Sequence, residues 1–316
     1  MNILITGAMG YLGSQIVKRL MTERNDCHVI ATDIKLEPDF ELTDSITYEQ
    51  VDVRSSELQQ LFERYHVDTV IHLATIVTPG KKSDRSFEYS VDVEGTRNVI
   101  EACVATNVKR LIVSSSGAAY GYHADNVNWI SEDEPIRGNG AFAYAYHKRL
   151  VEEMLADYHE SNQELEQIIF RIGTILGENV DNQITDLFKK PYILGVKGSK
   201  SPFVFIWDQD VVSCFIRAID SDQTGIYNIA GDGALTIDEI AEQLGKSVIR
   251  LPASLLRFGL AGLKKLRLTQ YGPEQLDFLR YRPVLDNTKM KKEFGFVPSY
   301  TSAQVFQRFV AQKQEE

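Results

Sequence analysis

The sequence is poor in cysteine, has no long hydrophobic run and carries fewer cationic than anionic side chains. Its three cysteines, Cys27, Cys103 and Cys214, form an odd set at wide spacing, which argues against a disulfide framework and a zinc site. We expect them to be small buried hydrophobic residues, and we predict no metal site. No stretch approaches the ~18 uninterrupted apolar residues of a membrane-spanning helix. The chain also reaches Gly7 after three apolar residues, too soon for a signal sequence, so we expect a cytoplasmic protein.

The excess of acidic over basic residues narrows the class of partner. With 34 Lys and Arg against 44 Asp and Glu, the net charge is -10, which argues against an extended nucleic-acid-binding surface. Nine prolines, 43% hydrophobic and 25% charged residues exclude wholesale disorder, a collagen-like repeat and a coiled coil. At ~150 residues per domain, the length predicts a globular protein of about two domains. We expect a small-molecule substrate, and neither a nucleic-acid nor a membrane partner.

Hydrophobic patterning in the first half of the chain indicates the fold class. Short β-branched runs alternate with stretches of helical spacing, the pattern of parallel strands joined by crossover helices. The expected strands are residues 2–5, 28–32, 46–51, 69–73, 110–113 and 167–170. The expected helices are residues 13–21, 56–65, 92–106 and 141–160. Six such strands predict an α/β fold with a doubly wound parallel sheet of the Rossmann type.

The second half has a looser pattern, in which glycines and prolines mark turns before a helix expected at residues 210–219. We expect a Rossmann domain over residues 1–171 and a smaller, discontinuous C-terminal substrate lobe over 172–316. Residues from about 203 to 230 are expected to return to the first domain. Thr236 and Glu239 have the spacing of a capping box, which predicts the start of a helix.

Residues 247–273 contain no acidic residue. Basic side chains lie there among leucines in an amphipathic pattern: Arg250, Arg257, Lys264, Lys265 and Arg267. Three interpretations are open. The segment is a helical lid over an anionic substrate, a membrane-surface helix, or a helix that packs one face on the C-terminal lobe and exposes the other.

A glycine-rich loop directly follows the first expected strand. Gly7, Gly10 and Gly13 allow a tight turn, close approach to a pyrophosphate and close packing of the next helix, whose N-terminal amides attract the anion. Asp33 ends the second strand, where a carboxylate accepts hydrogen bonds from the adenosine ribose and repels a 2′-phosphate. The sequence therefore predicts NAD as the cofactor, while Lys35 leaves NADP open.

Tyr144 and Lys148 are four residues apart, which places them on one face of an expected helix. An ammonium beside a phenol favours the phenolate, so we predict a Tyr144 pKa lowered from about 10 toward neutrality, as suits a general acid/base. Ser114 and Ser116 follow the fifth strand, at the carboxyl edge where open α/β sheets bind ligands. A serine there is placed to hydrogen-bond the reacting oxygen, although serines after a strand also form ordinary turns.

Taken in order, these motifs resemble the extended short-chain dehydrogenase/reductases, the NAD-dependent epimerase/dehydratase group. The matching segments are residues 6–13 (TGxxGxxG), 72–74 (HLA), 95–98 (GTxN), 113–121, 144–148 (YxxxK) and 225–230. The resemblance spans nearly the whole chain. It implies hydride transfer between a nicotinamide and a carbinol carbon.

The resemblance also implies roles for individual residues. Ser116 is expected to polarise the substrate, Tyr144 to act as the acid/base, and Lys148 to bind the nicotinamide ribose and tune Tyr144. The expected cofactor-binding residues are Gly7, Met9, Gly10, Tyr11, Leu12, Gly13, Asp33, Asp52, Val53, Leu73, Ala74, Thr75, Ser114, Tyr144, Lys148 and Arg171. Asp52 is expected at the adenine, although an Asp at that point is equally common as a turn or capping residue.

The substrate end departs from the family pattern. Nucleotide-sugar epimerases that resemble this chain often carry Asn and Arg where Thr174 and Phe203 stand here, so the diphosphate site is incomplete. Arg280 and Arg282 are expected to supply positive charge instead, or to form surface salt bridges. Trp207 is a further candidate for the cleft wall, although large aromatic residues are more often part of the core.

We expect an NAD-dependent epimerase or dehydratase that oxidises a sugar-like secondary alcohol, on a nucleotide sugar, to a transient ketone. Two alternatives are an NAD(P)H-dependent carbonyl reductase or alcohol dehydrogenase acting on a smaller metabolite, and a catalytically silent nucleotide-sensing protein. The resemblance further implies a homodimer paired through the helices expected at 92–106 and 141–160.

Overall fold

Seven parallel strands form the central sheet of the computed structural model, which describes residues 1–77, 84–200, 202–266, 272–273 and 275–315. Along the sheet the order is β10 (Gly225–Ile229), β6 (Glu166–Ile172), β5 (Arg110–Ser116), β4 (Thr69–His72), β1 (Asn2–Thr6), β2 (His28–Asp33) and β3 (Ile46–Gln50). The predicted doubly wound α/β fold is confirmed, and β10 adds a seventh strand to the six expected. This strand pairs with β6 in parallel, with Asn228 beside Arg171.

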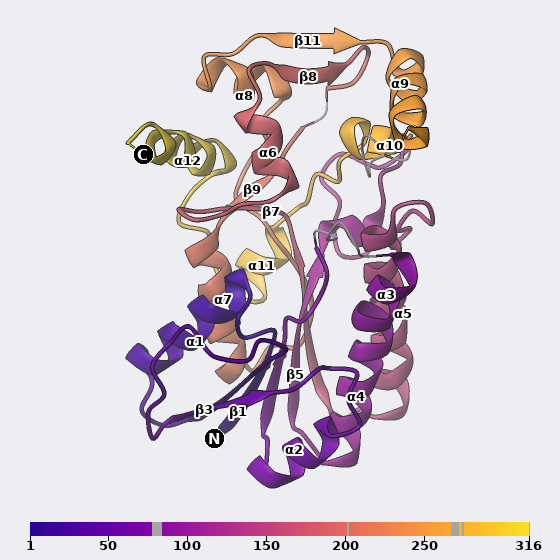
Figure 1. Ribbon diagram of the computed structural model, residues 1–316. Helices are drawn as coiled ribbons and strands as arrows, with labels where there is room; N and C mark the ends of the chain where they lie inside the picture. The colour runs from indigo at the N-terminus through magenta and orange to yellow at the C-terminus, as the bar shows by residue number, and fades with distance from the viewer. Residues whose placement is uncertain (78–83, 201, 267–271, 274, 316) are drawn as a thin grey trace.

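Helices cover both faces of the sheet (Figure 1). On one face α1 (Tyr11–Glu23) and α7 (Asp208–Asp220) pack on Ile3 and Ile5 of β1. On the other face α2 (Leu58–Tyr65), α4 (Gly95–Ala105) and α5 (Ala143–Ser161) pack on Leu4. Because neighbouring strand residues point to opposite faces, a strand covered on both sides is a continuous apolar run, as β1 is.

The helix expected at residues 92–106 is divided in the structure. It comprises α3 (Arg85–Tyr89), a π-helical turn η1 (Ser90–Glu94) and α4, so Asp92 lies inside the π turn. Thr96 Oγ1 donates to the Asp92 carbonyl at 2.5 Å. π turns inside longer helices often occur at functional sites, and in this one Asp92 accepts from Thr75 and Ile76, just after the carboxyl end of β4.

A smaller lobe is built from the second half of the chain. Its elements are β7 (Thr174–Leu176), α6 (Gln183–Lys189), β8 (Ile193–Val196), β9 (Phe205–Trp207), α8 (Ile237–Gln243), β11 (Val248–Leu251), α9 (Ala253–Lys265), α10 (Gln275–Arg280) and α12 (Ser302–Glu315). β8 pairs with β11 and β7 with β9. An aromatic core of Phe188, Phe203, Phe205, Phe306 and Phe309 holds the lobe together.

Two elements of the second half return to the large sheet. α7 packs on α1, and β10 extends the sheet and carries α11 (Thr288–Lys292). Within β9, Phe205 and Trp207 pack in the lobe core while Ile206 packs in the core of the large sheet, so the return begins within this strand. The capping box of Thr236 and Glu239 is present and starts α8 as predicted.

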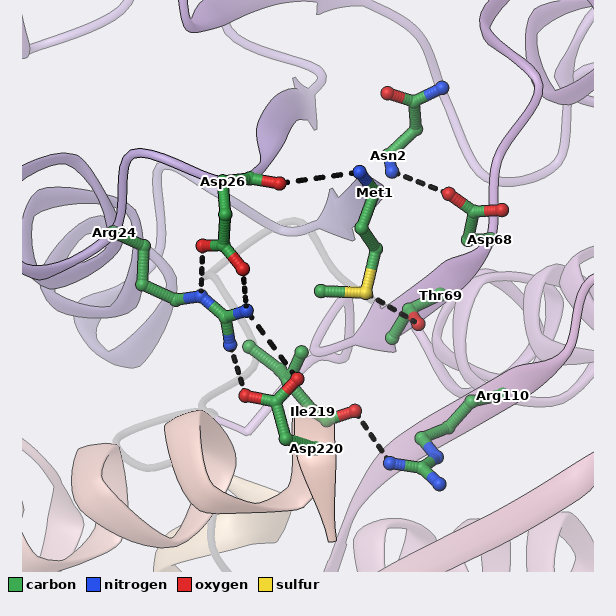
Figure 2. A network of polar contacts seen from close by, with 9 residues as sticks. All are labelled: Met1, Asn2, Arg24, Asp26, Asp68, Thr69, Arg110, Ile219 and Asp220. Atoms are coloured by element: carbon green, nitrogen blue, oxygen red, sulfur yellow. Dashed lines mark hydrogen bonds and ion pairs between the residues drawn. The ribbon is translucent and has the colours of Figure 1, made fainter.

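Polar contacts close the edge of the sheet opposite the ligand-binding edge (Figure 2). Arg24, after α1, pairs with both Asp26 and Asp220, the last residue of α7. Arg110 donates to the Ile219 carbonyl at 2.5 Å, which ties β5 to the same helix end.

The three cysteines are buried, as predicted. No helix among the described residues has the length and apolar character needed to cross a membrane.

Candidate active site

The glycine-rich loop lies at the point where the strand order reverses, between β1 and β4. Gly7 has φ +67°, and a Cβ there would lie 2.9 Å from the Ala74 nitrogen after β4. A Cβ on Gly13 would lie 2.2 Å from the Gly7 carbonyl oxygen. Both positions therefore require glycine, for the turn and for close packing of α1 on the loop.

The first turn of α1 is open to an anion. Gly10 precedes the helix without a side-chain cap, and no acidic residue lies in its first turn within the described chain. The amides of a helix N-terminus point outward and attract negative charge, so Tyr11, Leu12 and Gly13 present donors to a pyrophosphate. The Tyr11 hydroxyl donates to Asp208 at 2.5 Å, and Tyr11 and Leu12 both line a cavity that reaches the loop.

A cavity of about 750 Å³ lies beside the loop and fits the adenosine half of a dinucleotide. Asp33, Asp52, Val53 and Ala74 line it, as predicted for cofactor-binding residues. Asp33 accepts from the Met9 amide at 3.0 Å, which fixes its carboxylate at the end of β2. Met9 thus holds Asp33 through its backbone, and it does not line either of the two cavities among the described residues.

Lys35 and Asp52 each make a contact within the protein that the sequence alone does not indicate. Lys35 Nζ donates to the Met9 carbonyl at 3.0 Å, so its ammonium lies close to the loop. Asp52 forms an ion pair with Arg54 at 2.6 Å, and this guanidinium lowers the pKa of the Asp52 carboxyl. The adenine amino group would thus meet a carboxylate that Arg54 already engages.

A buried hydrogen-bonded chain positions residues 73–75. His72 Nδ1 is 2.7 Å from Thr6 Oγ1, and Nε2 is 2.9 Å from Thr96 Oγ1. Since Thr96 donates to the Asp92 carbonyl, His72 donates from Nε2 and accepts at Nδ1, as a neutral ring. Burial lowers the pKa of His72 to about 3, which keeps the ring neutral. The predicted wall residues Leu73, Ala74 and Thr75 follow directly.

Two of the three predicted catalytic residues, Ser116 and Tyr144, line a second cavity of about 490 Å³, which also reaches Gly7 and Gly10; Lys148 does not line it. Ser114 and Ser116 end β5 and line this cavity, together with Tyr144 of α5. Lys148 Nζ donates to the Ser114 carbonyl at 2.7 Å and lies 5.7 Å from the centre of the Tyr144 ring. One helical turn therefore presents the phenol and the ammonium to the carboxyl end of one strand.

The predicted lowering of the Tyr144 pKa is wrong for the ligand-free site. The pKa of Tyr144 is raised to about 12: burial is the largest cause, a hydrogen bond with Ser116 opposes the rise, and Asp92 adds to it. Burial also lowers the pKa of Lys148, although the negative charges of Asp92 and Glu152 act to raise it. Tyr144 is therefore a phenol here, because desolvation of the phenolate outweighs an ammonium whose proton is directed at a backbone carbonyl.

Two acidic residues lie behind the predicted catalytic residues, and no pattern in the sequence indicated either role. Asp92 accepts from Thr75 Oγ1 and the Ile76 amide, and its other oxygen is 2.9 Å from His147 Nδ1. Glu152 accepts from Arg171 at 2.7 Å and from Ser115. Glu152 thus links α5 to Ser115 of β5 and Arg171 of β6 behind the cavity wall.

Arg171 does not lie where the family resemblance implied. Its guanidinium pairs with Glu152, donates to Tyr120 Oη at 2.8 Å and to the Glu132 carbonyl at 3.2 Å, and is 4% exposed. The residues that line the two cavities do not include it within the described chain. Its place is explained by charge, because a buried guanidinium requires a carboxylate and several acceptors.

The substrate end has one well-placed cation. Arg282 lies between the rings of Phe203 and Phe278, 4.0 Å from each ring centre, and its Nε and Nη2 have no hydrogen-bond partner among the described residues. Burial lowers the pKa of Arg282 to about 10. Such a group in the wall of a cavity is placed to bind an anion.

The other predicted substrate residues divide into two groups. Thr174 lines the cavity with Arg282. Arg280 and Trp207 do not: Arg280 stacks on Tyr281, and Trp207 packs in the lobe core. Sequence reasoning missed an aromatic cluster in the wall, formed by Tyr122, Phe142 and Phe278. Phe278 stands four residues before Arg282, which is the one signal that pointed to it.

Comparison with known proteins decides the family. The model of the NAD dependent epimerase/dehydratase family matches residues 3–230. The chain belongs to this family. It is therefore an NAD-dependent enzyme, and its resemblance to the extended short-chain dehydrogenase/reductases is confirmed.

The chain is similar to some proteins over nearly its whole length and to others over about half of it. An uncharacterized protein of Mycobacterium tuberculosis is 23% identical over 312 residues, covering 96% of this chain and 82% of that protein. The sterol-4-alpha-carboxylate 3-dehydrogenase (decarboxylating) of Schizosaccharomyces pombe is 29% identical over 180 residues, covering 56% of this chain and 51% of that enzyme. The UDP-glucose 4-epimerase of Thermotoga maritima, solved with UDP-glucose, has a TM-score of 0.75 at 19% identity and covers 100% and 99% of the two chains. This last likeness shows that the fold is shared.

Proposed function

We propose that the enzyme oxidises a secondary alcohol of a nucleotide sugar to a transient ketone, as the first half of an epimerase or dehydratase cycle. One observation carries the proposal: the Ser116 and Tyr144 hydroxyls share the wall of a cavity that also reaches the glycine-rich loop. An alcohol bound there has its oxygen beside both hydroxyls and its carbon on the cofactor side. This is the arrangement that hydride transfer requires.

The side chains divide the work of moving one proton. Bound NAD supplies the acceptor for the hydride that leaves the carbinol carbon. Tyr144, as phenolate, accepts the hydroxyl proton and returns it when the ketone is reduced. Ser116 holds the substrate oxygen, and its hydrogen bond with Tyr144 already lowers the phenol pKa. Lys148 is the cation placed to favour the phenolate once the cavity is filled.

Arg282 supports a substrate that carries negative charge. A diphosphate accepts two or more hydrogen bonds, and Arg282 has two donor nitrogens without a partner among the described residues. The related epimerase of Thermotoga maritima was solved with UDP-glucose, a substrate of this charge. Thr174 adds a hydroxyl to the same wall.

A second candidate is a net dehydrogenase or reductase acting on a smaller, mostly apolar molecule with one anionic group. The cavity wall favours it, because Phe142, Phe203, Phe278 and Tyr122 surround the single cation, Arg282, among the described lining residues. The Schizosaccharomyces pombe relative is named as a dehydrogenase of a sterol carboxylate. Tyr144 as a phenol is also in the state that donates a proton to a ketone.

The nucleotide that the purified protein carries separates the two candidates. Freshly purified protein is denatured, and the released nucleotide is identified by absorbance and mass. Stoichiometric NAD supports the epimerase or dehydratase, which regenerates its cofactor within each cycle. An empty site that binds added NADH or NADPH reversibly, with consumption of reduced cofactor during turnover, supports the second candidate and contradicts the first.

A further inference from the structure

Helix α9 (Ala253–Lys265) has no buried residue. Phe258 is 82% exposed, more than any other large hydrophobic side chain among the described residues, and Leu255, Leu263 and Leu266 are 55%, 44% and 69% exposed. The helix stands at the end of the molecule farthest from the amino terminus (Figure 1). Of the three interpretations of this segment, the helix that packs one face on the C-terminal lobe and exposes the other leaves these large apolar side chains in contact with water.

The exposed apolar residues share one face of the helix. At 100° per residue, Leu255, Phe258 and Leu266 lie within one third of the circumference. Leu256 and Leu260, which are half-buried, lie on the opposite side and make the contact with the protein. Two glycines, Gly259 and Gly262, flatten the exposed face, since a Cβ at either would meet nothing within 4 Å.

The charge of α9 is opposite to that of the protein as a whole. The net charge of the chain is -10, yet α9 carries Arg257, Lys264 and Lys265 and no acidic residue. Lys265 flanks the apolar face directly beside Phe258, whereas Arg257 and Lys264 lie on the opposite side of the helix. A helix without acidic residues, with an apolar face and a basic residue at its edge, suits the boundary between the acyl chains and the headgroups of an anionic bilayer.

One short helix, α10, lies between α9 and the cavity that holds Arg282. α10 contacts α9 and provides Phe278 to the aromatic wall around Arg282. A surface bound by α9 is therefore one short helix away from an apolar cavity. This continuity fits a substrate that approaches from a lipid surface.

We propose that α9 docks the enzyme on an anionic membrane surface, with Leu255, Phe258 and Leu266 inserted and Lys265 near the lipid headgroups. This departs from the expectation that the protein has no membrane partner, because the sequence could not show that α9 is unburied. A second copy of the chain is a poorer occupant. A symmetric contact through this face would bring the basic side chains of two α9 helices together.

Co-flotation of the full-length protein with vesicles tests the proposal. One set of vesicles is phosphatidylcholine alone and the other contains phosphatidylglycerol as well. We expect binding to the anionic vesicles and weak binding to the neutral ones. Phe258→Glu should lower the partition coefficient at least tenfold. Lys265→Glu should lower it about fivefold or more, as expected for a basic residue at an anionic surface.

Val297→Glu is the matched control, since Val297 is 68% exposed and lies outside α9. It should bind anionic vesicles as the unaltered protein does. Equal thermal unfolding and NAD binding in all variants show that the fold and cofactor site are intact. Absence of flotation with both kinds of vesicle, or equal flotation after Phe258→Glu, would overturn the proposal. So would self-association of the unaltered protein that Phe258→Glu abolishes, if neither protein floats with vesicles.

Discussion

Replacing Arg282 by methionine should stabilise the ligand-free protein while it weakens substrate binding. A folded-state pKa of about 10 in place of 12.5 corresponds to a penalty of roughly 3 kcal/mol on the charged guanidinium. Stacking on Phe203 and Phe278 recovers about 1 kcal/mol for each ring. Methionine keeps the apolar contacts with both rings and has no charge to desolvate. We expect Arg282→Met to raise the free energy of unfolding by about 1 kcal/mol.

Urea unfolding followed by circular dichroism measures this difference. Arg308→Met is the control, because Arg308 also stacks on two rings, Trp207 and Tyr300, but is exposed. It should leave the free energy of unfolding unchanged or slightly lower. The gain from Arg282→Met should shrink above pH 10, where folded Arg282 loses its proton while the unfolded chain still binds it, so the unaltered protein becomes more stable as pH rises.

The expected loss of substrate binding in Arg282→Met is tested with UDP as the anionic probe. UDP should raise the unfolding midpoint of the unaltered protein and of Arg308→Met, and leave that of Arg282→Met unchanged. Destabilisation by more than about 1 kcal/mol in Arg282→Met would refute the reasoning, since it would mean that the guanidinium is a structural tie. Equal protection of both proteins by UDP would show that the anion binds elsewhere.

Three further changes test the cofactor site and its support. Gly13→Ala places a Cβ 2.2 Å from a backbone oxygen and should weaken NAD binding at least tenfold, measured by calorimetry, whereas Gly262→Ala meets nothing and should bind NAD normally. Glu152→Gln leaves the buried Arg171 charge uncompensated and should lower the free energy of unfolding by about 3 kcal/mol in urea; a loss below about 1 kcal/mol would contradict the ion pair. Asp33→Ser removes the charge that repels a 2′-phosphate and should shift the ratio of NADP to NAD affinity at least tenfold toward NADP; an unchanged ratio would place the ribose elsewhere.

The cofactor end could be predicted from the sequence because its residues act over short distances along the chain. Gly7, Gly10 and Gly13 belong to one strand, loop and helix start, and the close approaches at Gly7 and Gly13 are found in the structure. Tyr144 and Lys148 share one helical turn. Periodicity and turn chemistry encode such units locally.

The substrate end could not be predicted in the same way, because distant segments assemble it. Arg282 lies between Phe203 and Phe278, and no local pattern places residues so far apart in one stack. The Tyr144 pKa was predicted in the wrong direction for the same reason. Spacing indicates the nearby ammonium, but the burial that dominates depends on the packed wall. Likewise, residues 225–229 were expected to return to the first domain, but no local pattern indicates that β10 pairs with β6.

In the proposed reaction Tyr144 moves the proton, and Ser116 holds the substrate oxygen, during NAD-dependent oxidation of a nucleotide sugar. The most direct measurement mixes NAD-loaded protein with UDP-sugars or dTDP-sugars and follows the formation of NADH in a single turnover. We predict transient NADH with the unaltered protein and a loss of at least a hundredfold in its rate with Tyr144→Phe, at unchanged NAD affinity. Equal rates in Tyr144→Phe, or NADH that accumulates with net turnover, would contradict the account.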